Sequence, residues 1–373
     1  MGIRGLNKLI NQYAKNAFTE KTFSNLCGSK IAIDSEILIH KFKAHNNYSG
    51  INKNSHIHGF ISNVFWHLKN GIIPIYIFDG APSAAKRKNA LTKRFSQKER
   101  IYNRIEELEN IFLEQLKFKE EQLESKSVED SVTPEMNNTL DELFKLKRRM
   151  ESMTVTKNHK NECKYLLKLM GIPFVNANED AEALCTALQH KKKVDYVYTE
   201  DTDALTYAAA QLNNEIPESG PIILKKGETP NTVIAIDLSV ILREFGLTPN
   251  QFIDMCILSG CDFCSGIPRI GPMNSYTHIK KYQSIENFLK ETNTDVPEGF
   301  TYQEARDIFT KDHSQEITKT LELGNLNVED LKKYLIHERS LNPMPIISNY
   351  HTHMKYFKSK ISQKTLDNFF VKN

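Results

Sequence analysis

Hydrophobic and polar residues in the first 80 positions form a pattern that predicts strands separated by a helix. Two apolar runs, Lys30–Ile33 and Ile72–Phe78, have the length of buried strands, and each is followed by an acidic residue, Asp34 or Asp79. Between them, His58–Leu68 has apolar residues at helical spacing. Strands that are apolar throughout and joined by a helix are typical of a parallel sheet covered on both faces. Ligands of such sheets bind outside the carboxyl ends of the strands, where the two acids would lie.

The same alternation returns after residue 160. The predicted elements are a helix at Tyr165–Met170, a strand at Pro173–Val175, a helix at Ala181–His190, a strand at Val194–Tyr198 and a helix at Pro249–Leu258. A glycine-bracketed turn, Gly266–Pro272, follows and precedes a polar helical segment. We therefore predict an α/β fold with a mostly parallel sheet.

A long, highly charged excursion separates the two sets of strands. Ala84–Lys126 predicts one long helix, Ser125–Asn138 a polar interruption with Pro134, and Asn138–Met150 a second helix. The start of the excursion contains one acid, Glu99, among the basic residues Lys86, Arg87, Lys88, Lys93, Arg94, Lys98, Arg100 and Arg104. Such an excursion is a solvated projection or a functional lid, and long insertions are more often functional.

Composition excludes several classes of protein. Of 373 residues, 40% are hydrophobic and 25% charged, which allows a full core and excludes wholesale disorder. No apolar run reaches the ~20 residues that cross a bilayer, and the N-terminus lacks the order of a signal peptide. The six cysteines are therefore expected to be reduced and buried in a soluble intracellular protein. The net charge of +3 is too small to identify a nucleic-acid partner.

Acidic residues stand where predicted strands end and helices begin or end. They are Asp34, Asp79, Asp180, Glu182, Asp201, Asp203 and Asp262. Carboxylates gathered at one sheet edge repel one another unless a cation neutralises them. Oxygen ligands without His or Cys select Mg²⁺ or Mn²⁺ rather than zinc, and so large a set suits a two-metal site that acts on a phosphodiester. Each acid alone also fits an ordinary turn or helix-start residue, so their convergence in space is an inference.

These acids lie within longer stretches that together resemble one known family. The stretches are Met1-Gly-Ile-Arg-Gly-Leu6, Ile31-Ala-Ile-Asp34, Ile75-Tyr-Ile-Phe-Asp79-Gly80-Ala-Pro82, Asn161–Pro173, Asp180-Ala-Glu182-Ala, Thr199-Glu-Asp201-Thr-Asp203, Phe252–Phe263 and Ile270-Gly271-Pro272. In this order, from residue 1 to about 290, the chain resembles the flap endonucleases of the XPG-type structure-specific 5′-nuclease superfamily. The resemblance implies a PIN-like nuclease core with a helical arch and a helix–hairpin–helix element for DNA binding.

The resemblance assigns a role to all seven acids. They occupy the positions at which the family binds two Mg²⁺ ions, with Mn²⁺ as a substitute. One position departs from the family, because replicative flap endonucleases usually carry Glu where this chain has Asp180. The shorter side chain moves this carboxylate by about one methylene, which is expected to alter metal preference or rate.

The resemblance also implies contacts with DNA. Two basic residues at the base of the arch would steer the scissile phosphate. Counting from Asp79 selects Lys86 and Lys93, and counting back from Leu91–Arg94 selects Arg87 and Arg94; we name Lys86 and Arg94 as the catalytic pair. An ordinary solvated basic face is the alternative. The remaining implied DNA contacts are Gly2, His40, Arg87, Lys93, Asp180, Gly260, Asp262, Gly266 and Gly271.

The Gly266–Pro272 turn resembles the family's hairpin, where backbone amides and a bound K⁺ hold the duplex. Met273-Asn274-Ser275 follows in place of the usual basic residues, so a weaker grip is expected. An ordinary connection between helices is the alternative. The tail carries a separate motif, Gln363, Leu366, Phe369 and Phe370, which fits the peptide that binds the sliding clamp PCNA.

The resemblance implies a Mg²⁺-dependent 5′ flap endonuclease with 5′–3′ exonuclease activity that acts in DNA replication and repair. The predicted organisation is 1–83 and 159–290 as the two nuclease halves, 84–158 as the arch, about 255–285 as the helix–hairpin–helix, 291–360 as a helical segment and 361–373 as the clamp-binding tail. We expect a monomer in the nucleus, or at a site of viral DNA replication.

Part of the arch is longer than the family's usual arch, and we expect this insert, Glu120–Leu143, to be disordered without DNA. The alternatives to a flap endonuclease are a repair exonuclease or junction resolvase of the same superfamily, and a non-catalytic scaffold that binds DNA and the clamp. An unrelated phosphatase with Asp34 as nucleophile is a more distant alternative.

Overall fold

The computed structural model describes residues 2–3, 5–45, 53–123, 133–152, 155–229, 231–314 and 320–371, without the side chains of 44–45, 84, 88–97, 121–123, 148, 151–152 and 365–371. The core is a single sheet with the strand order β1-β7-β6-β5-β2-β3-β4. The strands are β1 (Phe18–Thr22), β2 (Lys30–Asp34), β3 (Ile73–Phe78), β4 (Phe174–Asn176), β5 (Tyr196–Tyr198), β6 (Ile222–Lys226) and β7 (Thr232–Asp237).

Five strands of the sheet, from β6 to β4, run parallel, whereas β7 pairs antiparallel with both β6 and β1. The predicted α/β fold with a mostly parallel sheet is therefore confirmed. The strands β2, β3, β4 and β5 lie where the apolar runs predict them. The sequence patterns did not predict β1, β6 and β7, which form one end of the sheet.

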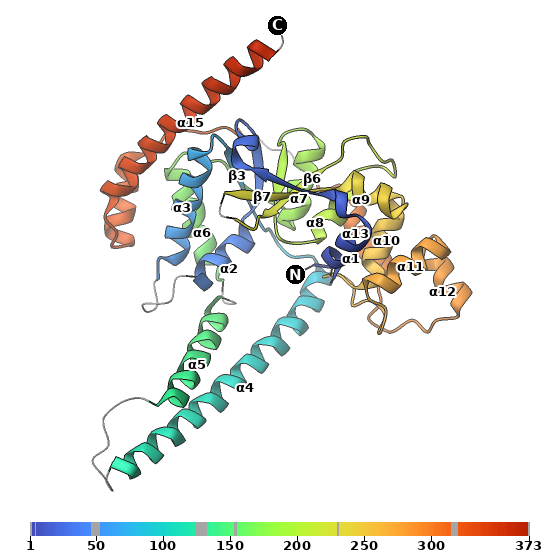
Figure 1. Ribbon diagram of the computed structural model, residues 1–373, viewed down its shortest axis with the longest axis horizontal. Helices are drawn as coiled ribbons and strands as arrows, with labels where there is room; N and C mark the ends of the chain where they lie inside the picture. The colour runs from blue at the N-terminus through green and yellow to red at the C-terminus, as the bar shows by residue number, and fades with distance from the viewer. Residues whose placement is uncertain are drawn as a thin grey trace.

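Alternating side chains of the central strands supply two separate hydrophobic cores. On β2, Ala32 faces one core and Ile31 and Ile33 face the other. The first core packs against α1 (Leu6–Tyr13), α7 (Ala181–His190), α8 (Asp203–Ala210), α9 (Leu238–Phe245) and α10 (Pro249–Ser259). The second core packs against α2 (Ser35–His45), α3 (Ser55–Lys69), α6 (Lys157–Leu169), α14 (Val328–Lys333) and α15 (Pro343–Val371). Figure 1 shows the resulting three layers.

A smaller helical lobe extends from the first layer. It contains α11 (Pro272–Tyr282), α12 (Ile285–Thr292) and α13 (Tyr302–Thr310), and α10 packs against α11, α12 and α13. The loop from Gly260 to Gly271 joins α10 to α11, so two helices and a turn lie where the helix–hairpin–helix was predicted. A π-helical turn, Tyr334–Glu338, follows α14.

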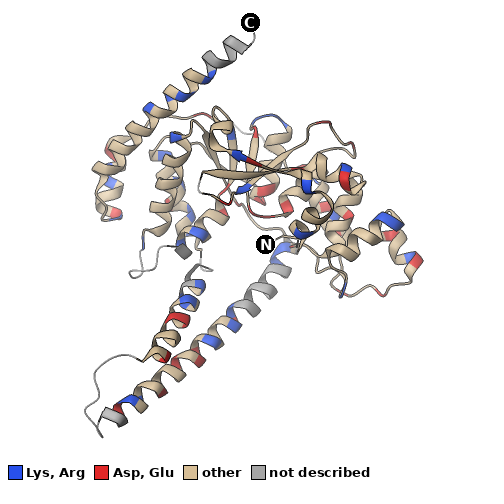
Figure 2. Cartoon of the chain, in the orientation of Figure 1, with Lys and Arg blue, Asp and Glu red and all other residues tan. Residues whose placement is uncertain are grey.

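The charged excursion is an antiparallel pair of helices, α4 (Ala84–Leu123) and α5 (Pro134–Ser152), which projects far from the core (Figure 1). Along α4 the basic residues lie mainly in the part nearer the core, and the acidic residues follow farther out (Figure 2). Leu108, Met136 and Leu143 are buried, and Arg104 pairs with Glu142 across the two helices at 3.0 Å.

The expectation that Glu120–Leu143 is disordered without DNA is wrong for most of that segment. Residues 120–123 continue α4 and residues 134–143 belong to α5, while 124–132 lie outside the described residues. The physical reason is that Met136 and Leu143 form an apolar seam with α4, which the density of charge in the sequence conceals.

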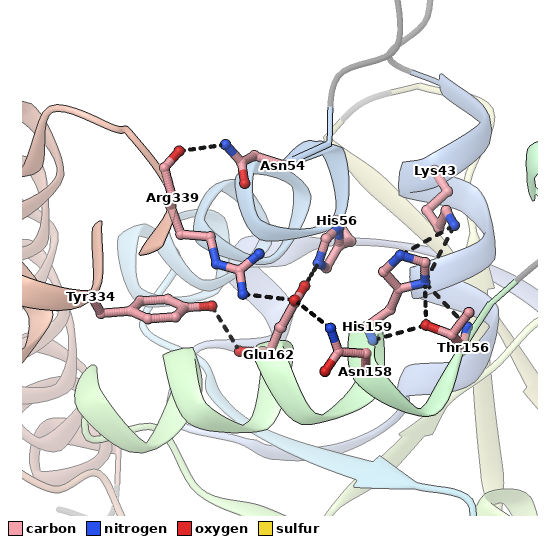
Figure 3. A network of polar contacts seen from close by, with 9 residues as sticks. All are labelled: Lys43, Asn54, His56, Thr156, Asn158, His159, Glu162, Tyr334 and Arg339. Carbon is pink, nitrogen blue, oxygen red and sulfur yellow. Dashed lines mark hydrogen bonds and ion pairs between the residues drawn. The ribbon is translucent and has the colours of Figure 1, made fainter. Parts of the chain in front are cut away.

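A polar network joins the end of the arch to the C-terminal segment (Figure 3). Glu162 on α6 accepts hydrogen bonds from Arg339 at 2.7 Å, from His56 at 2.6 Å and from Asn158 at 3.0 Å. The Arg339 guanidinium also lies 5.1 Å from the centre of the Tyr334 ring. The network thus fastens the segment after α14 to the helix that follows the arch. We call it the Glu162 network.

Most cysteines are buried, as the apolar runs around them predict. Five of the six are buried and Cys27 is half-buried, and none of these described residues forms a disulfide. Among the described residues, no helix combines the length and apolar character that a membrane crossing requires.

Candidate active site

The carboxylates converge at the carboxyl edge of the parallel strands. Asp34 is the last residue of β2, Asp79 directly follows β3, and Asp201 and Asp203 follow β5. Asp180 is the N-cap residue of α7, and Glu182 lies in the first turn of that helix. Neighbouring parallel strands end at one edge, so three distant parts of the sequence deliver their acids to one place.

Three of the acids form a compact group. One oxygen each from Asp79, Asp180 and Glu182 lie within 4.8 Å of one another. The side chain of Asp180 is 5% exposed and that of Glu182 is 8% exposed. Carboxylates this close and this buried are stable only when they share a proton or a cation.

Hydrogen bonds from the backbone and from one hydroxyl fix the orientation of the acids. Asp34 accepts from the Thr199 hydroxyl at 3.0 Å and from the Glu36 amide at 3.1 Å. Asp79 accepts from the Ala181 amide at 2.9 Å, so this bond ties the end of β3 to the start of α7. These bonds hold the carboxylates in position before any ligand is bound.

Two oxygens in the cluster have no partner within the described protein. Glu182 Oε2 and Asp203 Oδ1 are buried and accept no hydrogen bond. A buried charged oxygen without a partner is costly, so each marks a place for a ligand. Because every donor atom here is a carboxylate oxygen, the residues fit a hard divalent cation such as Mg²⁺ or Mn²⁺.

The electrostatics of the cluster also favour a bound cation. Burial, together with the charges of Asp79 and Asp201, raises the pKa of Asp34 to about 8. Burial also raises the pKa of Glu182 and of Asp203, and neighbouring carboxylates raise each further. Asp262 lies half-buried beside this group, and its negative charge contributes to the raised pKa of both Asp201 and Asp203. A cation would relieve this repulsion.

Lys86 is the basic residue that the structure places against the acids. Its Nζ donates to Asp180 Oδ1 at 2.6 Å. Burial alone would lower the pKa of Lys86, but the charges of Glu182, Asp180 and Asp79 outweigh it and raise this pKa. Arg87 instead donates to the carbonyl of Pro82 at 2.9 Å and is exposed. The side chains of Lys93 and Arg94 lie outside the described residues.

Two of the predicted DNA contacts are glycines that the geometry requires. Gly2 has φ of 79°, and a Cβ there would lie 2.1 Å from Asp201 Oδ1. Gly260 has φ of 89°, and a Cβ there would lie 2.9 Å from the carbonyl oxygen of Ser265. A side chain at Gly2 would therefore collide with the acid cluster, and one at Gly260 would break the turn that leads to Asp262.

The other predicted residues lie farther along the same face or beyond it. His40 is half-exposed on α2. Gly266 packs against Gly260 within the loop after α10, and Gly271 is the N-cap residue of α11 with open space around it. Gln363 is exposed on α15, whose backbone stays helical to Val371, while the side chains of Leu366, Phe369 and Phe370 lie outside the described residues.

Sequence reasoning missed two residues that contact the acids directly. Thr199 donates to Asp34, and Tyr207 Oη donates to Asp180 Oδ2 at 2.9 Å. Thr199 belongs to the stretch Thr199–Asp203, in which only the acids were predicted as site residues. Tyr207 follows Asp203 by four residues on a helix, a spacing that places both side chains on one face and could have indicated it.

Comparisons with known proteins identify the family of the chain. The chain matches the XPG N-terminal domain over residues 1–101 and the XPG I-region over residues 171–262. It is 34% identical over 385 residues to flap endonuclease 1 of Glycine max, covering 99% of this chain and 91% of that protein. It is 30% identical over 388 residues to flap endonuclease 1 of Cryptosporidium muris, covering 100% of this chain and 76% of that protein.

Among solved structures, the fold is similar to flap endonuclease-1 from Methanococcus jannaschii, with a TM-score of 0.62 and 23% identity. That match covers 92% of this chain and 97% of the other. At this identity the likeness concerns the fold alone.

Proposed function

This chain belongs to the flap endonuclease family of XPG nucleases, and we propose that its carboxylate cluster binds two divalent cations and hydrolyses DNA where a 5′ single strand meets a duplex. It is a structure-specific flap endonuclease with a role in DNA replication and repair. The observation that carries the metal proposal is the cluster of buried carboxylates with two unpartnered oxygens, Glu182 Oε2 and Asp203 Oδ1.

We assign the acids to two cations. Asp79, Asp180 and Glu182, which form the compact group, would hold the first together with Asp34, and Asp201, Asp203 and Asp262 would hold the second. When bound, the pair of cations supplies charge that stabilises the attacking and leaving oxygens of a phosphodiester. The proposed products are a 5′-phosphate and a 3′-hydroxyl.

The chain's own residues would bring the scissile phosphate to this place. Lys86 is a cation in the first turn of α4 that already faces the carboxylates at 2.6 Å from Asp180. If Lys86 exchanged the Asp180 oxygen for a phosphate oxygen, it would hold the substrate phosphate beside the acids. We also propose that the DNA backbone approaches the main chain at Gly2 and Gly260, two positions where a Cβ would collide with the protein itself.

Elements around the site would position the rest of the DNA. We propose that the duplex lies against the α10–α11 turn, with a K⁺ ion at its backbone, and that the single strand passes the arch. The tail motif beginning at Gln363 would bind the sliding clamp. A nuclear location, or a site of viral DNA replication, follows from this process.

The proposal is tested with a labelled double-flap DNA in Mg²⁺ or in EDTA, using the wild-type protein, Asp79→Ala and Asp203→Ala. We expect Mg²⁺-dependent cutting near the flap base and a loss of at least about 10³-fold in either variant, since each removes a metal ligand. An exposed acid on α5, Asp141→Ala, is the matched control and should cut normally. Binding of flap DNA by the wild-type protein without cleavage in Mg²⁺ or Mn²⁺ would leave only the non-catalytic scaffold.

A further inference from the structure

The Asp180 side chain is held from two sides. Its Oδ1 accepts from Lys86 Nζ at 2.6 Å, and its Oδ2 accepts from Tyr207 Oη at 2.9 Å. Aspartate is one methylene shorter than glutamate, so its carboxylate has less reach into the space shared with Asp79 and Glu182. A short carboxylate pulled by Lys86 alone would rotate toward that lysine. The hydroxyl of Tyr207 supplies the opposing bond.

The ring of Tyr207 cannot turn away from this contact. It is 1% exposed, and three rings pack around it, with centroid distances of 4.9 Å to Phe309, 5.0 Å to His313 and 6.4 Å to Phe263.

Tyr207 also connects the two groups of acids. It stands one helical turn after Asp203 on α8, and it reaches across to the N-cap residue of α7. The bond therefore fixes Asp180 relative to the acids that follow β5. Resting on the proposed metal site, we propose that Tyr207 is a positioning residue that holds the short Asp180 carboxylate in place for the first cation.

The test measures metal binding without DNA. Wild-type protein, Tyr207→Phe and Tyr76→Phe are freed of metal, and Mn²⁺ binding is followed by calorimetry and by electron paramagnetic resonance. Removing only the Tyr207 hydroxyl should weaken Mn²⁺ binding by about tenfold, the lower end of the cost of losing a ligand's hydrogen-bond partner. Tyr76→Phe is the matched control, because Tyr76 is also buried and donates at 2.6 Å to Asn63, away from the acids. It should bind Mn²⁺ as the wild type does.

A second background separates positioning from packing. In Asp180→Glu the longer side chain brings its carboxylate to the cation without help from Tyr207. Adding Tyr207→Phe should therefore weaken Mn²⁺ binding by no more than about twofold relative to Asp180→Glu alone. A normal Mn²⁺ affinity in Tyr207→Phe, with only lowered stability in EDTA, would show that Tyr207 is a core residue and overturn the proposal. An equal loss in both backgrounds would overturn it as well.

The proposed function fails in a different way. If the wild-type protein itself binds no Mn²⁺, the metal site is absent and both proposals fall. If it binds Mn²⁺ and Tyr207→Phe does not differ from it, only the role of Tyr207 is lost.

Discussion

At the residue scale, repulsion within the acid cluster destabilises the folded protein, and a bound cation would relieve it. Asp34 is 2% exposed, and its pKa of about 8 means that the folded protein favours the neutral carboxyl. For such a group the stabilising contribution is complete below the ordinary pKa near 3.8 and is lost as the pH rises through about 8. Without metal, the folded state should therefore weaken as the solution becomes more alkaline.

Asp34→Asn tests this directly. Asparagine imitates the neutral carboxyl, so the free energy of unfolding of the variant should exceed that of the wild type by about 2 kcal/mol at pH 8 in EDTA. At pH 4 the two proteins should be equally stable. Urea unfolding at both pH values measures the difference. Mg²⁺ should stabilise the wild type more than the variant. A constant difference between pH 4 and pH 8 would show that charge on Asp34 is not the cause.

Residue identity could be predicted for the acids but not for their partners. Asp34, Asp79 and Asp201 stand beside recognisable strands, so their common edge follows from the topology. Tyr207 lies in an apolar helical run in which its ring belongs to the core. The four-residue spacing from Asp203 places Tyr207 on the side of the acids, but which acid its hydroxyl meets follows only from the position of α7 in space.

At the element scale, the apolar central strands were predictable, whereas β1 at one edge of the sheet was not. Residues 31–33 of β2 and the whole of β3 are apolar, so their sequences alone indicate them. β1 has the sequence Phe-Thr-Glu-Lys-Thr and is half-exposed at the end of the sheet, where it depends on pairing with β7. Such a strand has little hydrophobic signal of its own.

The Glu162 network is the element-scale contact with the clearest energetic prediction. The Glu162 carboxylate pairs with Arg339, whose side chain is only 14% exposed, and accepts a hydrogen bond from His56. Glu162→Gln removes this negative charge. The variant should lose about 2 kcal/mol of unfolding free energy, because a largely buried cation loses its counterion. Limited proteolysis should cut the C-terminal segment sooner than in the wild type.

Glu329→Gln is the control for that measurement. Glu329 pairs with Lys332 within one helical turn and is 76% exposed, so its loss should cost less than about 0.5 kcal/mol. Equal and small losses in the two variants would show that the Glu162 network does not hold the C-terminal segment.

At the scale of the whole molecule, α15 joins the proposed clamp-binding motif to the nuclease core as one helix of 29 residues. It packs along α3, and Lys364 donates to the carbonyl of Cys27, so the start of the motif lies against the core. The motif is thereby presented on a defined element rather than on a free tail.

Phe369→Ala combined with Phe370→Ala should leave flap cutting by the protein alone unchanged and abolish the binding of a purified PCNA ring. The reason is that the two rings are the proposed anchors for an apolar pocket, where losing such anchors costs about 2–4 kcal/mol each. Surface plasmon resonance measures the binding. Tyr356→Ala, which removes an exposed ring earlier on α15, is the control. Undiminished clamp binding by the double variant would refute the role of the motif.

The long helix α4 has a mechanical consequence for the molecule. Its 40 residues span about 60 Å, and its first turn carries the lysine that is bonded to Asp180. The helix therefore begins beside the acid cluster and extends away from the core (Figure 1). A tilt of about 5° at this end displaces the far end by about 5 Å over such a length. Any tilt of α4 that accompanies the exchange of carboxylate for phosphate at Lys86 would therefore be magnified at the far end of this helix.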